Sequence, residues 1–514
     1  MTKNKEKEAI FKEISPSEFF YRNRELAGFT NPVRALYSAV RELVENSLDA
    51  CELAGILPDI YLKIGLLDGY KDKPDPRPYL LKIVDNGPGI DPKFVPNSFG
   101  KIFYGSKYLL KQSRGMFGMG GKMAILYGQI TTNRPVKVYT STDGKIAYNY
   151  QIMIDIKENK PVILEKSTSD AQGKRGTSVE LCLEGDYQRA YPKIKEYLTQ
   201  TSLVSPYANI FFVDAEDRVT VYERSTNLMP KSPTETKPHP YGVDFETLRR
   251  LVKESSQENL MNFLSKNFHR VGSRIAKKFL EKYNFDPKRD PKKLSDEEIL
   301  GLSKALHSYG EFLQPDASCL SPLGEEILKA GIQRNLNPEF LAIAIREPSA
   351  YLGFPFVVEV ALAYGGEKIP KGISLYRFAN KIPLLYDESS DVSWKVIKEL
   401  DLSRYNVRPD MALAFIVHIC SIKVPYKTLG KEFIADIPEI EREIRNGIRD
   451  VLRKLNQYLS RKRFMEKTKR KANIYAKYLP LIAKFSTELA QKKKLPRYKK
   501  LIGWRVDGDN EGKN

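Results

Sequence analysis

The clearest periodicity of apolar residues in the chain follows Pro32. Apolar or small residues recur there at helical spacing and form one stripe: Val33, Leu36, Val40, Leu43, Val44, Ser47 and Cys51. The pattern predicts a helix with Asn31 as its cap and Pro32 in its first turn. Opposite the stripe lie Glu42, Asn46 and Asp49, with Glu45 close by and small alanines beside them. Two interpretations stay open from this segment alone: a solvated helix face, or a polar floor on which a ligand lies.

Alternating apolar and polar residues predict strands further along the chain. The runs are 78–85, 135–141, 147–156 and 177–185, and all are rich in β-branched or aromatic residues. Since helical segments separate them, we expect an α/β sandwich over residues 31–228.

The remaining chain divides by composition. Residues 228–242 are rich in proline and predict a linker, and a compact, largely helical stretch follows over 243–312. Apolar runs at 354–366 and 374–387 predict a second β-containing domain, with helices around 394–400 and 439–460. We therefore expect an α+β multidomain protein. Its expected parts are residues 1–235, 236–312, 313–478 and a basic tail at 479–514.

Charge narrows the expected partners. The 514 residues carry a formal net charge of +20, and the pI is near 9.4. A chain this basic usually binds a polyanion, and nucleic acid is the first candidate; the alternative is a lysine-rich surface without a partner. We see no apolar run long enough to span a membrane and no signal peptide at the start, so a cytoplasmic protein is expected. The four cysteines and four histidines are scattered, which argues against a disulfide framework and a zinc ribbon.

A short acidic and glycine-rich turn follows the first predicted strand. In "PYLLKIVDNGPGID" (78–91) the buried-type strand ends at Asp85, and Gly87 and Gly89 come next. A carboxylate fixed at a strand end can accept a hydrogen bond from an exocyclic amine, and glycines let a flat base approach the backbone closely. An ordinary turn explains the same letters, so this segment alone does not decide.

A second glycine-rich segment opens an apolar helix. In "RGMFGMGGKMAILYG" (114–128), Gly115, Gly118, Gly120 and Gly121 precede the helix, where free backbone N–H groups suit phosphates. The segment is not a Walker A loop, because Lys122 is followed by Met instead of Ser or Thr. It is not a Rossmann fingerprint either, because position 123 is not glycine.

The order of the three segments is more specific than any one of them. E-x-x-x-N on a helix, D-x-G-x-G after a strand, and G-x-x-G-x-G before a helix together resemble the Bergerat (GHKL) ATP-binding fold of gyrase, MutL and sensor histidine kinases. The resemblance implies that Asp85 holds the adenine amine, that Asn46 ligates Mg²⁺ and that Glu42 is the general base that activates water. It also implies a lid over residues 98–121 and a matching threonine, Thr177, in "RGTSVEL".

The implied ATP-binding set is larger than these residues. Besides Asn46, Asp85 and Thr177 it includes Gly87, Gly89, Gly115, Met116, Phe117, Gly118, Met119, Gly120, Gly121 and Lys122. The chemistry agrees, since Mg²⁺ and phosphate need oxygen ligands and a carboxylate that positions water.

Within the GHKL group the chain resembles the B subunits of DNA topoisomerase VI, a type IIB topoisomerase. The segments "FGKIFYGSKY", "KPHPYGVD", "FANKIPLLYD" and "CSIKVPYKTLGKE" carry the resemblance, together with the region around the first helix. It implies a GHKL ATPase domain, a helix-two-turn-helix insert and an α/β transducer domain with a long C-terminal helix. It further implies phosphate contacts from Ser106 and Lys107 on the lid, and from Lys431 of the transducer.

The same resemblance implies partners. They are the topoisomerase VI A subunit, which carries the catalytic tyrosine (an A2B2 heterotetramer), double-stranded DNA, and a second copy joined through the ATPase domain when ATP is bound. The chain itself has no D-x-D cluster suited to DNA cleavage, since Asp507 and Asp509 lie in the polar tail. We therefore expect it to supply ATP-driven motion and not strand scission.

Two other classes of GHKL protein are weaker matches. A sensor histidine kinase needs a phosphoacceptor histidine before its ATP-binding domain, and no histidine precedes His239. The +20 charge, together with "KPHPYGVD" and the neighbouring motifs, argues against a mismatch-repair or chaperone ATPase. Two basic segments leave DNA contact open against plain packing or solvation: 268–280, and 453–473 with nine lysines or arginines and one glutamate.

Overall fold

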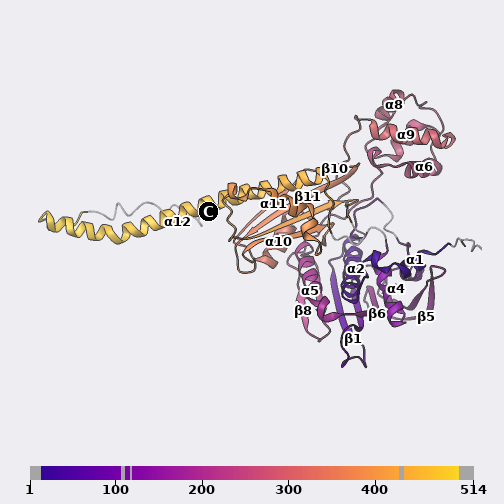
Figure 1. Ribbon diagram of the computed structural model, residues 1–514, viewed down its shortest axis with the longest axis horizontal. Helices are drawn as coiled ribbons and strands as arrows, with labels where there is room; N and C mark the ends of the chain where they lie inside the picture. Colours follow the sequence, from indigo (N-terminus) through magenta and orange to yellow (C-terminus); the bar gives the residue numbers. More distant parts are fainter. Residues whose placement is uncertain (1–12, 106–109, 116–117, 428–432, 497–514) are drawn as a thin grey trace, which may run out of the picture. The chain divides into compact units, whose positions relative to one another are not determined.

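The computed structural model describes residues 13–105, 110–115, 118–427 and 433–496. The chain forms two compact units, one of residues 1–400 with 409–451 and one of residues 401–408 with 452–514. The first unit holds two β-sheets and a cluster of helices, and both sheets appear in Figure 1.

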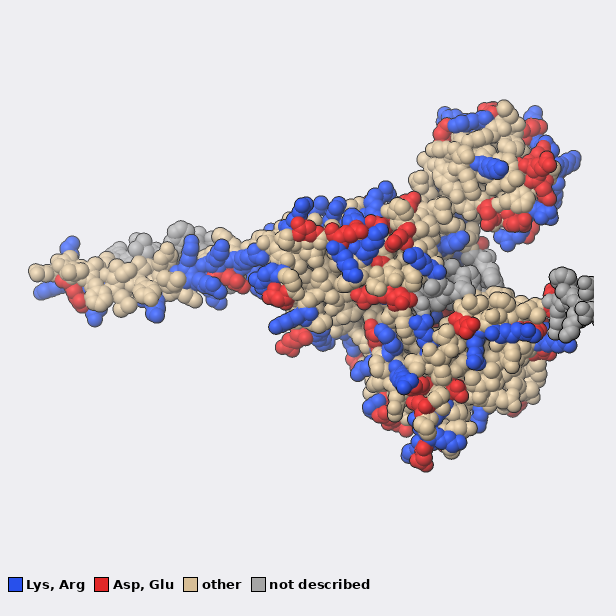
Figure 2. Space-filling view, in the orientation of Figure 1, with Lys and Arg blue, Asp and Glu red and all other residues tan. Residues whose placement is uncertain are grey.

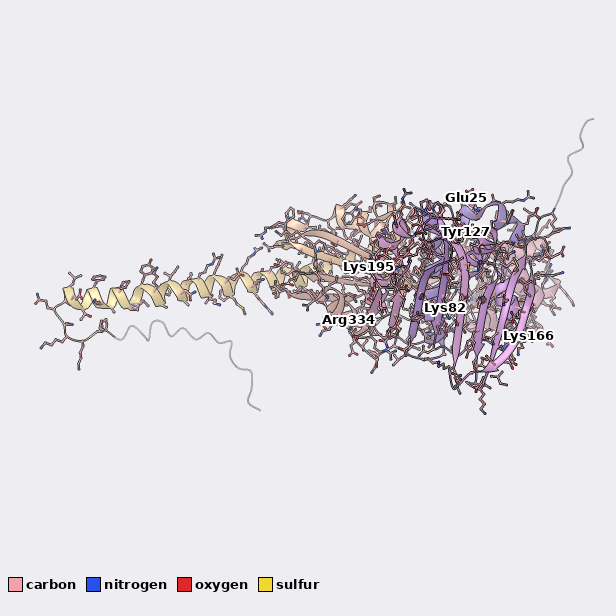
Figure 3. The ribbon with its side chains drawn as sticks, turned by 90° about the horizontal axis from the view of Figure 1, so that it is seen from below. Glu25, Lys82, Tyr127, Lys166, Lys195 and Arg334 are labelled. Atoms are coloured by element: carbon pink, nitrogen blue, oxygen red, sulfur yellow. The ribbon has the colours of Figure 1, made fainter. Side chains whose placement is uncertain are left out.

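The N-terminal sheet has the strand order β5-β4-β3-β6-β2-β1-β7-β8. Its strands are β1 (Asp59–Leu66), β2 (Arg77–Asp85), β3 (Val136–Ser141), β4 (Ile146–Asp155), β5 (Lys160–Asp170), β6 (Gly176–Gly185), β7 (Asn209–Val213) and β8 (Val219–Tyr222). β1 and β7 pair in parallel, and the other neighbours pair antiparallel. Figure 3 labels Lys82 on β2 and Lys166 on β5.

The four strands that the sequence predicts are all present, as β2, β3, β4 and β6. β1, β5, β7 and β8 are additional. β5 is exposed along nearly its whole length and pairs only with β4. An edge strand with neither face buried has no need of alternating apolar residues, so its sequence gives little signal.

Three helices form the layer against this sheet: α2 (Pro32–Leu53), α4 (Gly120–Thr132) and α5 (Tyr187–Val204). Shorter helices are α1 (Pro16–Arg22), η1 (Arg24–Ala27) and α3 (Val95–Gly100). α2 begins as predicted, because the Asn31 side chain accepts a hydrogen bond of 2.9 Å from the Arg34 N–H. The solvated-face interpretation of α2 is wrong, since Glu42, Glu45 and Asp49 are all buried and only Asn46 among the four polar residues is exposed.

The helices of the middle stretch share one apolar core. They are α6 (Phe245–Glu254), α7 (Leu260–Asn267), α8 (Ser273–Lys282) and α9 (Asp296–Ser308), with the short helices η2 (Pro240–Gly242) and η3 (Pro291–Lys293). Their core cluster runs from Val243 to Phe312 and includes Phe263, Phe279 and Tyr309. This agrees with the helical stretch expected at 243–312.

The second sheet has the order β10-β11-β14-β12-β13, and β9 pairs with β11. Its strands are β9 (Phe340–Ile345), β10 (Ser349–Tyr351), β11 (Phe354–Tyr364), β12 (Gly372–Ala379), β13 (Ile382–Pro383) and β14 (Ala412–Ser421). The helices of this region are α10 (Gly324–Leu336), α11 (Val392–Glu399), η4 (Glu388–Ser390) and η5 (Leu402–Tyr405). β11 and β14 are buried almost throughout, which explains their continuous apolar sequences.

The last helix, α12 (Pro438–Leu489), is longer than the 439–460 expected from its apolar residues. The buried stripe ends at Leu459, but the lysines, arginines and alanines that follow favour helix, and the helix continues through Pro480. Figure 2 shows Lys and Arg side chains gathered along part of this helix. Among the described residues, no helix has both the length and the apolar character that crossing a membrane requires.

Candidate nucleotide site

A pocket of about 340 Å³ opens between α2, the end of β2, the start of β6 and the start of α4. Eleven of the residues predicted from sequence line it: Glu42, Asn46, Asp85, Gly89, Gly115, Gly118, Met119, Gly120, Gly121, Lys122 and Thr177. Gly87 lies in the turn behind Asp85 and is not part of the lining. Ser106, Lys107, Met116, Phe117 and Lys431 fall outside the described residues. The structure therefore brings the three sequence segments together around one cavity.

Asp85 ends β2 with its carboxylate in the pocket, 8% exposed. Oδ1 accepts hydrogen bonds from the N–H groups of Gly87 (3.0 Å) and Thr177 (3.2 Å), and Oδ2 accepts one from the Ser47 hydroxyl (3.0 Å). Burial raises the pKa of Asp85, and these three hydrogen bonds oppose the shift. The fixed carboxylate is thus a directed acceptor at the pocket wall.

Two glycines of the site stand where an added Cβ would collide with a neighbouring group. Gly89 has φ +73°, and a Cβ there would lie 2.3 Å from the carbonyl oxygen of Ser141. A Cβ on Gly120 would lie 1.7 Å from the Glu42 carboxylate, so the start of α4 rests directly on that side chain. Both glycines therefore allow close packing within the protein; their proposed approach to a nucleotide stays a prediction.

Glu42 has a cationic neighbour that sequence reasoning missed. The Arg41 guanidinium lies 3.1 Å from the Glu42 carboxylate and 3.6 Å from that of Glu45, and all three residues are buried. Burial lowers the pKa of Arg41, but the charges of Glu42 and Glu45 outweigh it and raise the pKa above its usual value. The sequence did carry a signal for this contact, because residues four apart on a helix, such as Arg41 and Glu45, can form an ion pair.

Lys122 of the glycine-rich segment is buried at the start of α4. Its ammonium group donates to the carbonyl oxygen of Tyr104 and to that of Gly118 (3.1 Å). Lys122 therefore links the backbone at Tyr104 to the backbone at Gly118, and both residues line the pocket.

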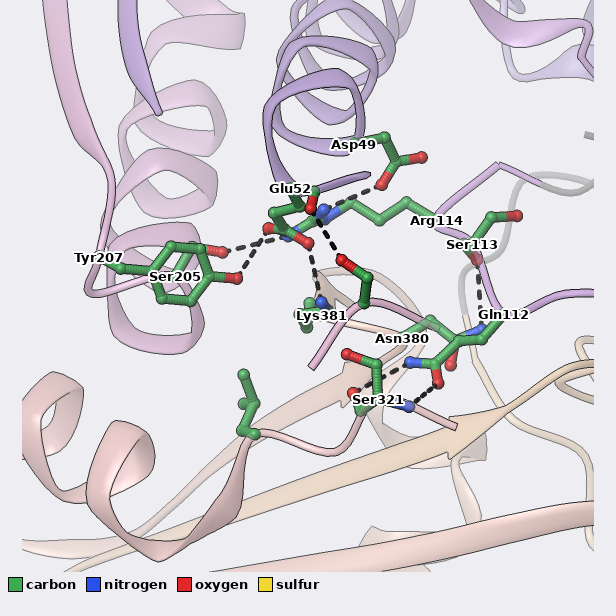
Figure 4. Close-up of polar contacts among 12 residues, drawn as sticks. Asp49, Glu52, Gln112, Ser113, Arg114, Ser205, Tyr207, Ser321, Asn380 and Lys381 are labelled. Atoms are coloured by element: carbon green, nitrogen blue, oxygen red, sulfur yellow. Dashed lines mark hydrogen bonds and ion pairs between the residues drawn. The ribbon is translucent and has the colours of Figure 1, made fainter. Parts of the chain in front are cut away.

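Below the pocket, α2 carries a buried ion cluster that sequence reasoning also missed (Figure 4). Arg114 lies 2.9 Å from Asp49 and 2.6 Å from Glu52, and Lys381 lies 2.8 Å from the other oxygen of Glu52. The Tyr207 hydroxyl also donates to Glu52, at 2.7 Å. Although burial alone raises the pKa of Glu52, the two cations lower it below the usual value, so this carboxylate is ionised.

The loop that carries Lys431 is anchored on its described sides. Tyr426 and Ile434 form an antiparallel bridge, and the Lys427 N–H donates to the Phe433 carbonyl oxygen at 3.4 Å. Burial raises the pKa of Tyr426 above its usual value, and the charge of Glu45 raises it further while that of Arg41 lowers it. The base of this loop is therefore within electrostatic reach of α2.

Comparison with known proteins gives two family matches. Residues 31–185 match the Histidine kinase-, DNA gyrase B-, and HSP90-like ATPase family, and residues 315–471 match the Topoisomerase VI B subunit, transducer family. The B subunit of type 2 DNA topoisomerase 6 from Saccharolobus shibatae is 45% identical over 480 residues, which cover 92% of this chain and 89% of that protein. The chain belongs to the family of topoisomerase VI B subunits.

The corresponding B subunit from Saccharolobus solfataricus is 44% identical over the same shares of both chains. The fold expected from sequence is therefore confirmed: an α+β protein with a GHKL ATPase domain and a transducer domain. As a B subunit of this family, the chain is the ATP-dependent component of a type II DNA topoisomerase. The domain boundaries and the role of each site residue remain predictions.

Proposed function

We propose that the chain binds and hydrolyses ATP in the pocket at α2, and uses the resulting closure of a homodimer to drive one DNA duplex through a break made by the A subunit. The observation that carries the proposal is the meeting of Glu42, Asn46, Asp85 and the glycine-rich segment around one cavity. No single segment was decisive in the sequence, and their assembly is what an ATP site requires.

Each group has a chemical part in this proposal. The Asp85 carboxylate accepts a hydrogen bond from the adenine amine, and backbone N–H groups at the start of α4 bind the phosphates. Glu42 holds the attacking water and takes its proton. Lys431 contacts the terminal phosphate from the transducer side, which the proximity of Tyr426 to the charges of α2 supports.

The residues present fit a magnesium ion. Asn46 and Glu42 offer oxygen ligands one helical turn apart on the pocket side of α2, and oxygen is the ligand that Mg²⁺ prefers. We propose that Asn46 holds the ion, which when bound neutralises phosphate charge.

We further propose that the A subunit joins this chain in an A2B2 heterotetramer and binds the far part of α12. Large apolar side chains are exposed there, among them Phe464, Met465, Ile482 and Phe485 at 71%, 68%, 59% and 59%. A solvated helix rarely exposes so many, and an interface explains them. Substituting Ile482→Lys and Phe485→Lys should weaken co-purification with the A subunit and leave ATP binding unchanged.

One assay tests the proposal as a whole. The chain is purified with and without the A subunit of the same source, and relaxation of supercoiled DNA is followed with ATP and Mg²⁺. We expect relaxation only with both proteins and ATP. Relaxation by the chain alone, or by the pair without nucleotide, would contradict it.

A further inference from the structure

The turn between β12 and β13 holds a lysine in an unusual conformation. Asn380 and Lys381 form this two-residue turn with φ of +48° and +67°. Asparagine tolerates that region but lysine seldom adopts it, so a left-handed lysine persists only where its surroundings fix it. Here the Lys381 N–H donates to His418 Nε2 at 3.0 Å, and its ammonium group reaches Glu52 at 2.8 Å.

Residues 113 and 114, which lead into the glycines of the nucleotide pocket, contact the same turn or share a partner with it. The Asn380 side chain donates to the Ser113 carbonyl oxygen at 3.2 Å, and Arg114 shares the Glu52 carboxylate with Lys381. Gln112 exchanges two hydrogen bonds with the backbone of Ser321, at 2.7 Å and 3.3 Å. Three consecutive residues, 112–114, therefore bind the transducer region or share a partner with it, and Gly115 of the nucleotide pocket follows directly.

The contacts continue into the transducer sheet. His418 on β14 lies 2.7 Å from Glu359 on β11, whose two carboxylate oxygens accept the N–H groups of Leu323 (2.9 Å) and Gly324 (2.7 Å). Glu359, His418 and Cys420 gather as potential metal ligands do. However, both ring nitrogens of His418 and both oxygens of Glu359 are already engaged within the protein, so we interpret the cluster as a structural link.

The ion cluster at the start of this path is electrically balanced. Its two carboxylates, Asp49 and Glu52, face its two cations, Arg114 and Lys381, and all four are buried. Removing one member leaves a buried charge uncompensated, whereas removing Glu52 and Lys381 together leaves Arg114 with Asp49. Removing Glu52 and Lys381 together therefore tests the link between the nucleotide pocket and the transducer sheet without leaving an unpaired buried charge.

We infer that Arg114, Glu52 and Lys381 form a positioning link that transmits nucleotide binding from the glycine-rich loop to the transducer sheet, alongside the contact expected from Lys431. The inference rests on the proposed function. When a nucleotide binds and displaces Gly115, the neighbouring Arg114 is displaced with it. The ion pairs of Glu52 with Arg114 and Lys381 pass this displacement to the turn, and the Lys381 N–H passes it to His418.

The first test uses hydrogen exchange on the full chain with a non-hydrolysable ATP analogue and Mg²⁺. Wild type should gain protection both at the start of α4 (118–127) and around the turn (376–384). The balanced double variant Glu52→Gln/Lys381→Met should keep the gain at 118–127 and lose it at 376–384. An unchanged gain at 376–384 in the double variant would overturn the inference.

The second test uses the complex with the A subunit and counts supercoils relaxed per ATP hydrolysed. This ratio should fall about 10-fold in the double variant. The single variants Glu52→Gln and Lys381→Met should instead lower the melting temperature by roughly 5 °C or more, since each leaves an unpaired buried charge. A wild-type ratio in a folded double variant would refute the link.

Lys395→Met is the matched control, because Lys395 also belongs to the transducer region and pairs with a carboxylate, Glu441, at 3.1 Å. Lys395→Met should leave unchanged both the protection at 376–384 and the number of supercoils relaxed per ATP. If it lowered them as much as the double variant does, the effect would be non-specific and the inference would be overturned. Failure of the proposed function looks different, since wild type itself would then show no ATP-dependent relaxation.

Discussion

Glu42 and Asp85 are both carboxylates of one pocket, but their surroundings differ. Glu42 lies beside the Arg41 guanidinium and under the backbone of Gly120. Asp85 accepts three hydrogen bonds from uncharged groups. A carboxylate of α2 that lies beside the start of α4 suits proton transfer near a phosphate, and one held at the end of β2 suits recognition. Their substitutions should therefore have different effects.

Replacing Glu42 with alanine should slow ATP hydrolysis strongly and leave nucleotide binding intact. ATP hydrolysis should fall by at least ~10²-fold, as for a lost general base. We expect Asp85 and the glycine-rich segment still to hold the nucleotide, so ATP should trap the closed dimer. Steady-state hydrolysis and sedimentation with ATP measure the two effects, and loss of nucleotide binding would show that Glu42 is structural.

Replacing Asp85 with asparagine should weaken ATP binding by about 10- to 100-fold, because a hydrogen bond to a charged acceptor is lost. Since burial raises the pKa of Asp85, protonation begins at a higher pH than for a free aspartate. Wild-type affinity should therefore fall as the pH is lowered through that raised pKa, and the variant should lack this loss. Calorimetric titrations with ATP across pH measure both, with Asp91→Asn as the control on the same turn.

Sequence could predict Glu42, Asn46, Asp85 and the glycines because each lies in a short motif whose spacing carries the signal. It could not predict Arg114, Glu52 and Lys381 as one cluster. Glu52 is 62 residues from Arg114 and 329 from Lys381, and only folding brings them together. A lone arginine or lysine in a sequence is ordinarily a solvated side chain.

At the scale of elements, the contact between α5 and α10 joins parts distant in sequence. α5 belongs to the layer on the first sheet, and α10 packs against β9 of the second. The two helices approach closely at Gly331, where a Cβ would lie 1.9 Å from the Leu203 carbonyl oxygen. Such an approach requires glycine.

Lys431→Ala should lower ATP turnover strongly and leave ADP affinity nearly unchanged, because only ATP offers the terminal phosphate that we propose this lysine contacts. Residual hydrolysis should be uncoupled from strand passage. Lys427→Ala is the control at the same loop, and a generic loss of positive charge would harm both variants equally and depend on salt. Equal loss of ATP and ADP binding would remove Lys431 from the site.

Gly331→Ala should destabilise the chain by about 1–3 kcal/mol, since the new methyl group displaces α10 from α5. Gly301→Ala is the matched control: that glycine lies in α9 with nothing within 4 Å of its added Cβ. The control should stabilise by about 0.5–1 kcal/mol through helix propensity. Thermal melting of both variants checks the opposite signs.

At the scale of the whole molecule, ATP can drive closure only by binding the closed form more tightly than the open one. The chain should therefore be largely monomeric alone and dimeric with a non-hydrolysable ATP analogue and Mg²⁺. A shift from 1:99 to 99:1 requires a preference of about 10⁴ for the closed form. Sedimentation velocity measures this, and an analogue-independent mass would contradict it.

The proline-rich segment 228–242, predicted as a linker, is held against the protein at several points. The Thr234 N–H donates to the Cys319 carbonyl oxygen at 3.1 Å, and the Thr236 N–H donates to that of Leu110 at 3.0 Å. Thr234 precedes the helical cluster in the chain and Cys319 follows it, and one hydrogen bond joins the two residues. Because its two ends are adjacent, the segment 234–319 can be replaced without separating the parts of the chain that flank it. A short glycine-rich hairpin that joins residue 233 to residue 320 should leave both sheets folded. Another domain could be inserted at the same place.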